Sequence, residues 1–191
     1  MKQVQLVLCR HTEVDLNAQH RYTGQIDVSL NSVGEMQAEK LAIDLSKFNI
    51  SAIFSSDLKR AMQTASKISL FHPQLVLKSD RRLREVNLGQ INGMRKSDAK
   101  HKYPDPRFST QNPNFDFSDV GGESRDQVIW RYAEFFDELA NNLGADTDEL
   151  SNIIAVGHGT ALRIFLESLG ISNQLEQGNY QIIQYYSAKQ T

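Results

Sequence analysis

Short apolar runs alternate along the chain with longer segments in which apolar residues recur every three or four positions. The short runs predict β-strands, and the longer segments have the spacing of amphipathic helices. The predicted strands are Val4–Cys9, Ser51–Ser56, Gln74–Ser79, Asn152–Val156 and Tyr180–Tyr186. The predicted helices are Asn31–Phe48, Asp57–Phe71 with Asp57 as its N-cap, Glu123–Leu143 and Thr160–Leu169. This alternation predicts an α/β fold, a three-layer sandwich in which helices cover both faces of a mainly parallel sheet.

A proline-rich stretch interrupts this alternation. Pro104, Pro106 and Pro113 lie close together among Asn, Asp and Ser residues, which is typical of a long loop. We therefore expect residues 1–191 to form a single catalytic domain in which residues 92–122 are a loop-rich cap excursion. The aromatic residues of the excursion, which we expect to form a small core of their own rather than to cover a ligand, are Tyr103, Phe108, Phe115 and Phe117.

Net charge and cysteine content limit the classes of partner and the cellular location that we expect for this chain. The 191 residues carry 21 Lys and Arg against 23 Asp and Glu, so the net charge of −2 gives no bulk attraction to nucleic acid or an anionic membrane. A lone cysteine, Cys9, cannot form an internal disulfide, and no apolar run has the length of a signal peptide or a membrane span. We expect a cytoplasmic enzyme or binding protein. The sequence does not indicate an oligomeric state.

Cationic and imidazole side chains follow three of the predicted strands. Arg10 and His11 end the first strand, Arg60 lies in the first turn of the helix after the second, and His158 follows the fourth. Sites in open α/β sheets form outside the carboxyl ends of the strands, so these side chains would meet in one crevice. Such a set can bind a phosphoryl group, with Arg10 holding the anion and His11 attacking it.

Each of these residues also has an ordinary structural explanation. A histidine after a strand is more often a partly buried group than a catalyst, and an arginine on an amphipathic helix usually faces solvent. Gly157 and Gly159, on either side of His158, could simply form a tight turn. The shared position at three strand ends favours a site, because unrelated structural residues need not converge.

Other residues are weaker candidates. Glu85 could be a general acid, although a surface carboxylate paired with Arg81, Arg82 or Arg84 is the commoner arrangement. Asn17 and the turn at residues 21–24 could line the same crevice or could be ordinary turn residues.

Competing chemistries lack their sequence patterns. A cysteine phosphatase needs an arginine six residues after its cysteine, where this chain has Asp15. The chain has no nucleotide P-loop, GxGxxG, HExxH or GxSxG motif, and its histidines lack metal-ligand spacing. We expect neither a metal nor a cofactor.

The stretch LCRHTEVDLN resembles the R-H-G-E-T-x-x-N signature of the histidine phosphatase superfamily, which includes the cofactor-dependent phosphoglycerate mutases. Further similar segments follow in the same order along nearly the whole chain. They are YTGQIDVSLNSVGEMQA, IFSSDLKRAMQTA, LREVNLGQINGM, GGES and VGHGT. The resemblance implies a mainly parallel sheet flanked by helices, with insertions that form a cap over the site.

The resemblance also implies roles for individual residues. His11 would be the nucleophile, Glu85 the proton donor, and Arg10, Arg60 and His158 the phosphate pocket. The residues implied at the edge of the phosphate and substrate site are Asn17, Thr23, Gly24 and Gly159. Thr12, Val14 and Thr160 depart from the family pattern, and we expect Thr12 to reshape the rim of the pocket.

The expected activity is metal-independent hydrolysis of a small phosphorylated metabolite through a phosphohistidine at His11. An α-ribazole phosphate and a sugar phosphate are candidate substrates. One alternative is a cofactor-dependent phosphoglycerate-type mutase. Another is a non-catalytic protein that binds a phosphorylated ligand, although His11 and Glu85 are both present.

Overall fold

A five-stranded sheet forms the centre of the protein in the computed structural model, which describes residues 2–143, 150–172 and 174–187. The strand order is β3-β2-β4-β1-β5, and only β5 runs antiparallel to its neighbour within this described sheet. The strands are β1 (Gln3–Arg10), β2 (Ala52–Ser55), β3 (Leu77–Ser79), β4 (Asn152–Gly157) and β5 (Tyr180–Tyr186). The predicted α/β class with a mainly parallel sheet is confirmed.

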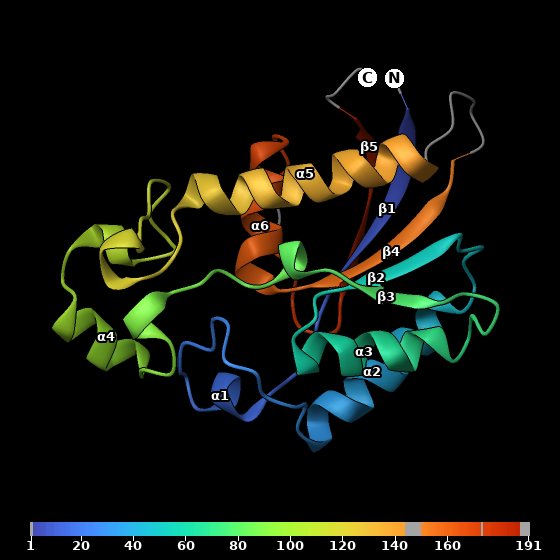
Figure 1. The fold of residues 1–191 in the computed structure, drawn as a ribbon. Helices are drawn as coiled ribbons and strands as arrows, with labels where there is room; N and C mark the ends of the chain where they lie inside the picture. Colours follow the sequence, from blue (N-terminus) through green and yellow to red (C-terminus); the bar gives the residue numbers. More distant parts are fainter. Residues whose placement is uncertain (1, 144–149, 173, 188–191) are drawn as a thin grey trace.

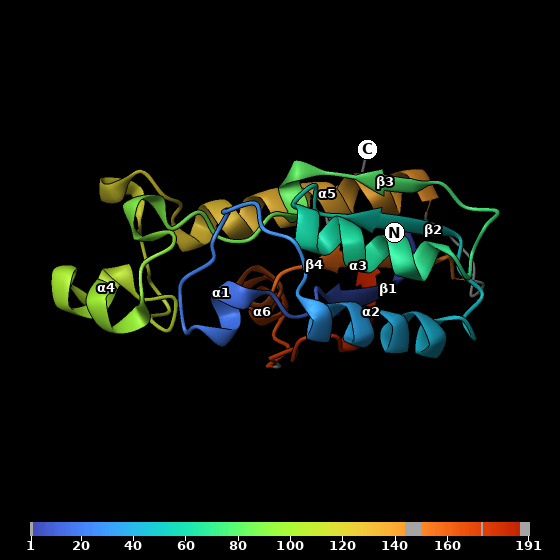
Figure 2. The ribbon, with the colours of Figure 1, turned by 90° about the horizontal axis from the view of Figure 1, so that it is seen from below.

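Helices cover the two faces of the sheet, as Figures 1 and 2 show. One face packs against α2 (Ser32–Leu45) and α3 (Lys59–Ser69), and the other against α5 (Arg125–Leu143) and α6 (Gly159–Ser168). The short helices α1 (Asp15–Ala18) and α4 (Lys96–Lys102) lie outside these layers. The arrangement is the expected three-layer sandwich. In the described part of the chain, no helix is both long and apolar enough to cross a membrane.

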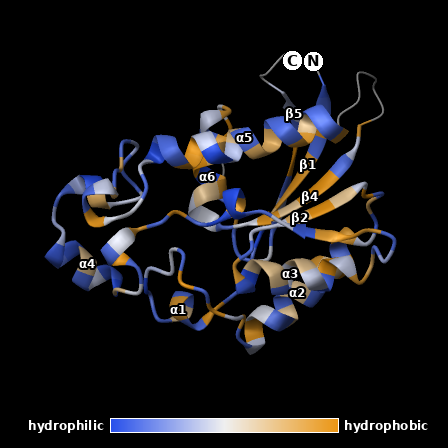
Figure 3. Ribbon diagram, in the orientation of Figure 1, coloured by the Kyte–Doolittle hydropathy of each residue, from blue (hydrophilic) through white to orange (hydrophobic). Residues whose placement is uncertain are grey.

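The apolar character of β1 follows from burial on both sides. Leu6 and Leu8 pack into the cluster formed with α5 and α6, whereas Val7 and Cys9 pack into the cluster formed with α2 and α3. Successive strand residues point to opposite faces, so a strand covered on both faces needs a continuous apolar run. The central strands are accordingly hydrophobic in Figure 3.

Several element boundaries differ from the sequence predictions. Asp57 is not a helix cap: α3 begins at Lys59 after Leu58, and the carboxylate of Asp57 accepts hydrogen bonds of 2.7 and 2.6 Å from Arg84. The third strand covers only Leu77–Ser79 instead of the six predicted residues, and α5 begins two residues later than expected. The antiparallel direction of β5 and the helices α1 and α4 were not predicted.

Residues 92–122 extend from the carboxyl-end side of the sheet, where α4 lies in Figures 1 and 2. Phe115 and Phe117 are buried, and they contact one another with ring centroids 5.4 Å apart. They belong to the same apolar cluster as α5 and α6, so the predicted separate core is instead an extension of the main one.

Candidate active site

The carboxyl ends of β1, β2 and β4 bring most of the predicted residues together. Arg10 pairs with Gly157 across the β1–β4 ladder, and the His11 amide donates to the Gly157 carbonyl at 3.0 Å. An open cavity of about 180 Å³ lies at this edge. The sequence-predicted residues that line it are Arg10, His11, Asn17, Thr23, Gly24, Arg60, Glu85 and Gly159.

His11 is held in one orientation and one tautomer by its two neighbours. Its Nδ1 lies 2.6 Å from the carbonyl oxygen of Thr12, and Arg60 Nε donates to its Nε2 at 3.2 Å. This network assigns the proton to Nδ1 and leaves the lone pair on Nε2. Burial and then the charge of Arg60 lower the pKa of His11 well below its ordinary value, so the imidazole is neutral. A neutral imidazole with an unprotonated Nε2 is a competent nucleophile once Arg60 gives up its hydrogen bond to that nitrogen.

Arg60 is fully buried in the first turn of α3 and is tied to the loop between α1 and α2. Its two terminal nitrogens donate at 2.7 Å to the carbonyls of Gly24 and Ile26. Gly24 has a φ of +46°, which favours glycine and lets its carbonyl meet the guanidinium. Burial lowers the pKa of Arg60 to about 10, so this arginine stays charged at neutral pH.

Arg10 lies directly against the backbone of Gly159. One terminal nitrogen donates to the Leu175 carbonyl at 2.8 Å, and Nε has no partner in the described part of the chain. A Cβ on residue 159 would meet Arg10 Nε at 2.7 Å, so Gly159 leaves the space that the guanidinium occupies. Burial lowers the pKa of Arg10.

His158 lies beside His11, with ring centroids 5.0 Å apart, but it is not among the described residues that line the cavity. It is fully buried, and within the described ranges neither ring nitrogen has a hydrogen-bond partner. Burial and then Arg60 lower its pKa well below the ordinary value. A buried unpaired polar group costs about 1–3 kcal/mol. His158 and Arg10 therefore hold unused hydrogen-bonding capacity next to the nucleophile.

Glu85 reaches the cavity from the irregular segment between two short 3₁₀ turns, Arg81–Leu83 and Gly89–Ile91. Its carboxylate accepts hydrogen bonds from the amides of Ala161 at 2.9 Å and Thr160 at 3.2 Å, at the N-terminus of α6. The alternative of a surface carboxylate paired with a neighbouring arginine is wrong for Arg82 and Arg84, which pair with Asp80 and Asp57.

Two further residues that the sequence singled out, Asn17 and Thr12, have different positions relative to the cavity. Asn17 donates to the Thr23 hydroxyl at 3.3 Å and accepts from Gln177 at 2.8 Å, so it supports the cavity wall. The expectation that Thr12 reshapes the rim is wrong. Its side chain is buried, and its hydroxyl lies 3.2 Å from that of Thr64, outside the cavity lining that the structure describes.

Known proteins with similar sequences define the family. A model of the histidine phosphatase superfamily (branch 1) matches residues 6–187. The chain belongs to the histidine phosphatase superfamily. The glucosyl-3-phosphoglycerate phosphatase of Mycobacterium tuberculosis is 33% identical over 180 residues, which cover 91% of this chain and 79% of that protein. The metal-independent phosphoserine phosphatase of Arabidopsis thaliana is 35% identical over 165 residues, which cover 83% of this chain and 66% of that protein.

Solved structures agree with this assignment. The native structure of a mycobacterial glucosyl-3-phosphoglycerate phosphatase superposes with a TM-score of 0.81 at 29% identity, covering 96% of this histidine phosphatase and 91% of that chain. The predictions of the family and of a phosphatase-type enzyme are confirmed.

Sequence reasoning missed two cations of this histidine phosphatase site, Lys96 and Arg163, and it named Arg21 only as part of a turn that could line the crevice. Arg21, Lys96 and Arg163 line the cavity and are more exposed than His11 and Arg60, so they form its outer part. Glu85 is the one carboxylate among the described lining residues. Arg163 is fixed by Glu167 and by the Thr110 carbonyl, each at 2.6 Å. A signal for Arg163 was present, because residues four apart share a helix face and Gly159 begins the same helix.

The remaining candidates for chemistry lie elsewhere. Cys9 is buried in the cluster on the α2–α3 face, and burial raises the pKa of its thiol. A metal-binding group of three or more His, Cys, Asp or Glu side chains is not found within the described ranges.

Proposed function

We propose that this histidine phosphatase hydrolyses a small phosphomonoester in two steps, without a metal, through a phosphohistidine at His11. The observation that carries the proposal is the state of His11. Its Nδ1 is bonded to a carbonyl, its Nε2 holds the lone pair, and it shares one cavity with Arg10, Arg60 and Glu85. The two arginines supply the positive charge that phosphoryl transfer needs.

In the first step, His11 Nε2 attacks phosphorus and the bond from phosphorus to the ester oxygen breaks. Glu85 gives its proton to the departing oxygen. Arg60 Nε, which donates to His11 Nε2 in the free enzyme, turns to a phosphoryl oxygen once that lone pair forms the new bond. Arg10 lines the cavity and is a further donor. We propose that His158, buried beside His11, donates to the phosphoryl group once that group is on His11. Loss of one such donor raises a barrier by ~3–4 kcal/mol.

In the second step, Glu85 is a carboxylate and accepts a proton from water. The water oxygen attacks phosphorus, and the phosphorus–nitrogen bond breaks. Inorganic phosphate leaves, His11 regains its Nε2 lone pair, and Glu85 is again protonated. The Nδ1 hydrogen bond to Thr12 holds the ring still throughout.

The outer cations favour a substrate with a second negative group. A phosphoryl group occupies the inner site, so Arg21, Lys96 and Arg163 face the part of the molecule that leaves. Phosphoserine and phosphoglycerate groups, which appear in the names of the relatives, carry a carboxylate beside the phosphate. We therefore rank acidic phosphoesters above sugar phosphates and α-ribazole phosphate, which have no second acid.

We also propose that residues 92–122 act as a cap over this site. Lys96, Thr110 and Gln111 come from this stretch, and all three line the cavity. The cytoplasmic location stays a proposal from the sequence.

Phosphate release from a panel of phosphomonoesters, measured in excess chelator, tests the activity. The panel contains phosphoserine, phosphoglycerates, a sugar phosphate, α-ribazole phosphate and p-nitrophenyl phosphate. We expect release that resists the chelator, vanishes in His11→Ala and is fastest for an acidic ester. Loss of release in chelator with restoration by a divalent metal would contradict the mechanism. Tight binding without turnover by the folded wild type would indicate a binding protein.

A mutase is the second candidate, because a relative from Cytophaga hutchinsonii named 2,3-bisphosphoglycerate-dependent phosphoglycerate mutase matches at 28% identity over 165 residues. Incubation of 3-phosphoglycerate with a bisphosphoglycerate primer distinguishes the two activities. We expect free phosphate and no primer-dependent isomer. Isomerisation faster than phosphate release would favour the mutase.

A further inference from the structure

The segment that carries Glu85 has no regular secondary structure of its own. Residues 84–88 lie between two short 3₁₀ turns, so no helix or sheet ladder fixes them in place. A proton donor must nevertheless hold its position closely, since a displacement of about 1 Å can cost ~10²-fold in rate. Contacts from other elements must therefore fix this segment.

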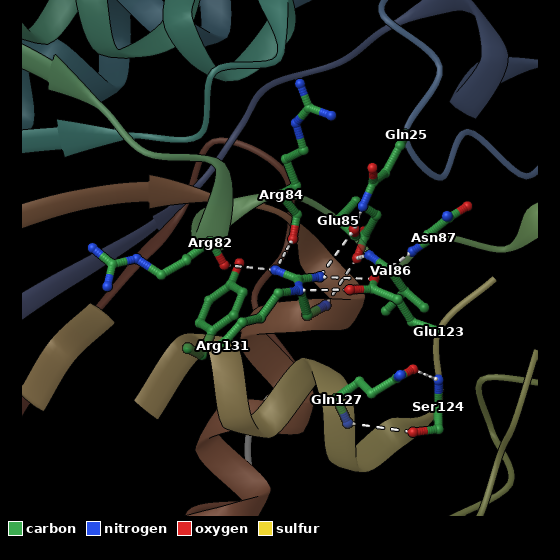
Figure 4. Close-up of polar contacts among 12 residues, drawn as sticks. Gln25, Arg82, Arg84, Glu85, Val86, Asn87, Glu123, Ser124, Gln127 and Arg131 are labelled. Atoms are coloured by element: carbon green, nitrogen blue, oxygen red, sulfur yellow. Dashed lines mark hydrogen bonds and ion pairs between the residues drawn. The ribbon is translucent and has the colours of Figure 1, made fainter. Parts of the chain in front are cut away.

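Arg131 on α5 supplies many of these contacts, as Figure 4 shows. It donates at 2.6 Å to the Arg82 carbonyl, at 2.7 Å to the Arg84 carbonyl and at 3.1 Å to the Glu85 carbonyl. One side chain thus bonds three carbonyls within four consecutive residues. Its exposed fraction is only 9%, so these bonds are largely shielded from water.

Glu123 completes the arrangement and fixes Arg131 in turn. Its two carboxylate oxygens accept from Arg131 at 2.9 and 3.1 Å, and one of them also accepts from the Asn87 amide at 2.8 Å. The Glu123 amide donates back to the Asn87 carbonyl at 2.8 Å. With these bonds, all of the N–H donors of the Arg131 guanidinium are used. The planar fork of an arginine suits such a clamp, and a lysine could not reproduce it.

The carbonyl and the carboxylate of Glu85 are held by different elements, and the carboxylate also accepts from the adjacent Val86 amide at 3.0 Å. The Glu85 carbonyl accepts from Arg131 and also from Gln25 at 2.9 Å, whereas its carboxylate is bound by the first amides of α6. The α6 contacts hold only the carboxylate, so the bonds from Arg131 and Gln25 to the carbonyl restrain the backbone that carries it.

We propose that Arg131, braced by Glu123, is a positioning residue that fixes Glu85 for proton transfer to the leaving group. Two simpler roles for Arg131 do not explain its contacts. A residue that only paired with Glu123 would not need bonds to three carbonyls, and a residue that only filled space would not need a charge. This inference rests on the proposed role of Glu85 as the proton donor. It predicts that damage to the clamp affects the steps that need that proton more than the steps that do not.

Leaving-group dependence tests the inference. An alkyl phosphate needs a proton on its departing oxygen, whereas p-nitrophenolate leaves without one. General acid catalysis contributes ~10²–10⁴-fold. The second step is the same for every substrate, so the comparison uses kcat/KM, which reports the first step alone. We therefore expect Arg131→Met to lower kcat/KM on the best alkyl ester of the panel roughly tenfold or more beyond its effect on p-nitrophenyl phosphate. Glu123→Gln should show the same difference between the two substrates, but a smaller one. It replaces Arg131→Met as the test variant if Arg131→Met does not fold.

Arg82→Met is the matched control. The Arg82 side chain pairs with Asp80 and Glu138 beside the same segment, and its carbonyl, which Arg131 binds, is kept in the variant. We expect Arg82→Met to change kcat/KM for the alkyl ester and for p-nitrophenyl phosphate by the same factor. Glu85→Gln is the reference variant. When Arg131→Met is added to it, kcat/KM for the alkyl ester should fall hardly any further, because the proton donor is already absent.

Two results would overturn the inference. One is an equal loss of kcat/KM on both substrates in Arg131→Met, and the other is an undiminished effect of Arg131→Met in the Glu85→Gln background. These results differ from failure of the proposed function. If Glu85 is not the proton donor, Glu85→Gln itself will show no preference for the good leaving group, whatever Arg131→Met does.

Discussion

Mild acid should destabilise the free enzyme, because the fold keeps two adjacent histidines neutral. Burial and then the charge of Arg60 lower the pKa of both His11 and His158 well below 6.5, the ordinary value. Above pH 6.5, both imidazoles are neutral in the folded and the unfolded chain, so their titration does not change the free energy of unfolding. Below it, the unfolded chain binds protons that the folded chain does not, and the free energy of unfolding falls.

The size of the effect follows from the number of groups. One pH unit below its ordinary pKa, each histidine that stays neutral in the fold costs on the order of 1 kcal/mol, and the pair costs about 2–3 kcal/mol. That is a large part of the ~5–15 kcal/mol that stabilises a typical domain. Carboxylates titrate mainly below this range, since their ordinary pKa values are about 4.

Urea unfolding at about pH 7.5 and about pH 5.5 measures the change directly. The matched control is the double variant His11→Asn with His158→Gln, which removes both imidazoles and should lose most of the pH dependence. A wild-type free energy of unfolding that is the same at both pH values would refute the reasoning. So would a double variant with the full wild-type loss.

Other predictions follow from single contacts. Gly159→Ala should displace the Arg10 guanidinium and lower kcat/KM ~10²-fold or more, as measured by phosphate release, while thermal unfolding shows an intact fold. Lys96→Met and Arg163→Met should raise KM for phosphoserine or phosphoglycerate but not for p-nitrophenyl phosphate, and an equal rise for both classes would exclude a second anion site. Cys9→Ala should keep its activity, and iodoacetamide should not inactivate the native enzyme, because the thiol is buried away from the cavity.

The fold could be predicted wherever local pattern decides the structure. A strand covered on both faces must be apolar throughout, so β1 and β4 stand out in the sequence. The direction of β5 leaves no such signal, since apolar residues suit parallel and antiparallel pairing alike. Asp57 has the chemistry of a helix cap, but it binds Arg84, 27 residues away along the chain. Local patterns do not reveal such competition from a distant partner.

The site was predictable to the extent that parallel topology places it. Arg10, His11 and Arg60 meet because strands that share a direction end at one edge. Glu85 was only a weak candidate, because the amides that bind its carboxylate belong to a helix about 75 residues later. Arg131 gave no signal, since its partners are backbone carbonyls and only the folded chain assembles them.

A pre-steady-state experiment on Glu85→Gln tests the phosphohistidine most directly. With p-nitrophenyl phosphate, the first step needs no acid but the second step needs a base, so the phosphoenzyme should accumulate in this variant. The account predicts a burst of p-nitrophenol equal to the enzyme concentration, together with acid-labile phosphate on the peptide that contains His11. A linear time course with no phosphate on that peptide at any quench time would contradict it.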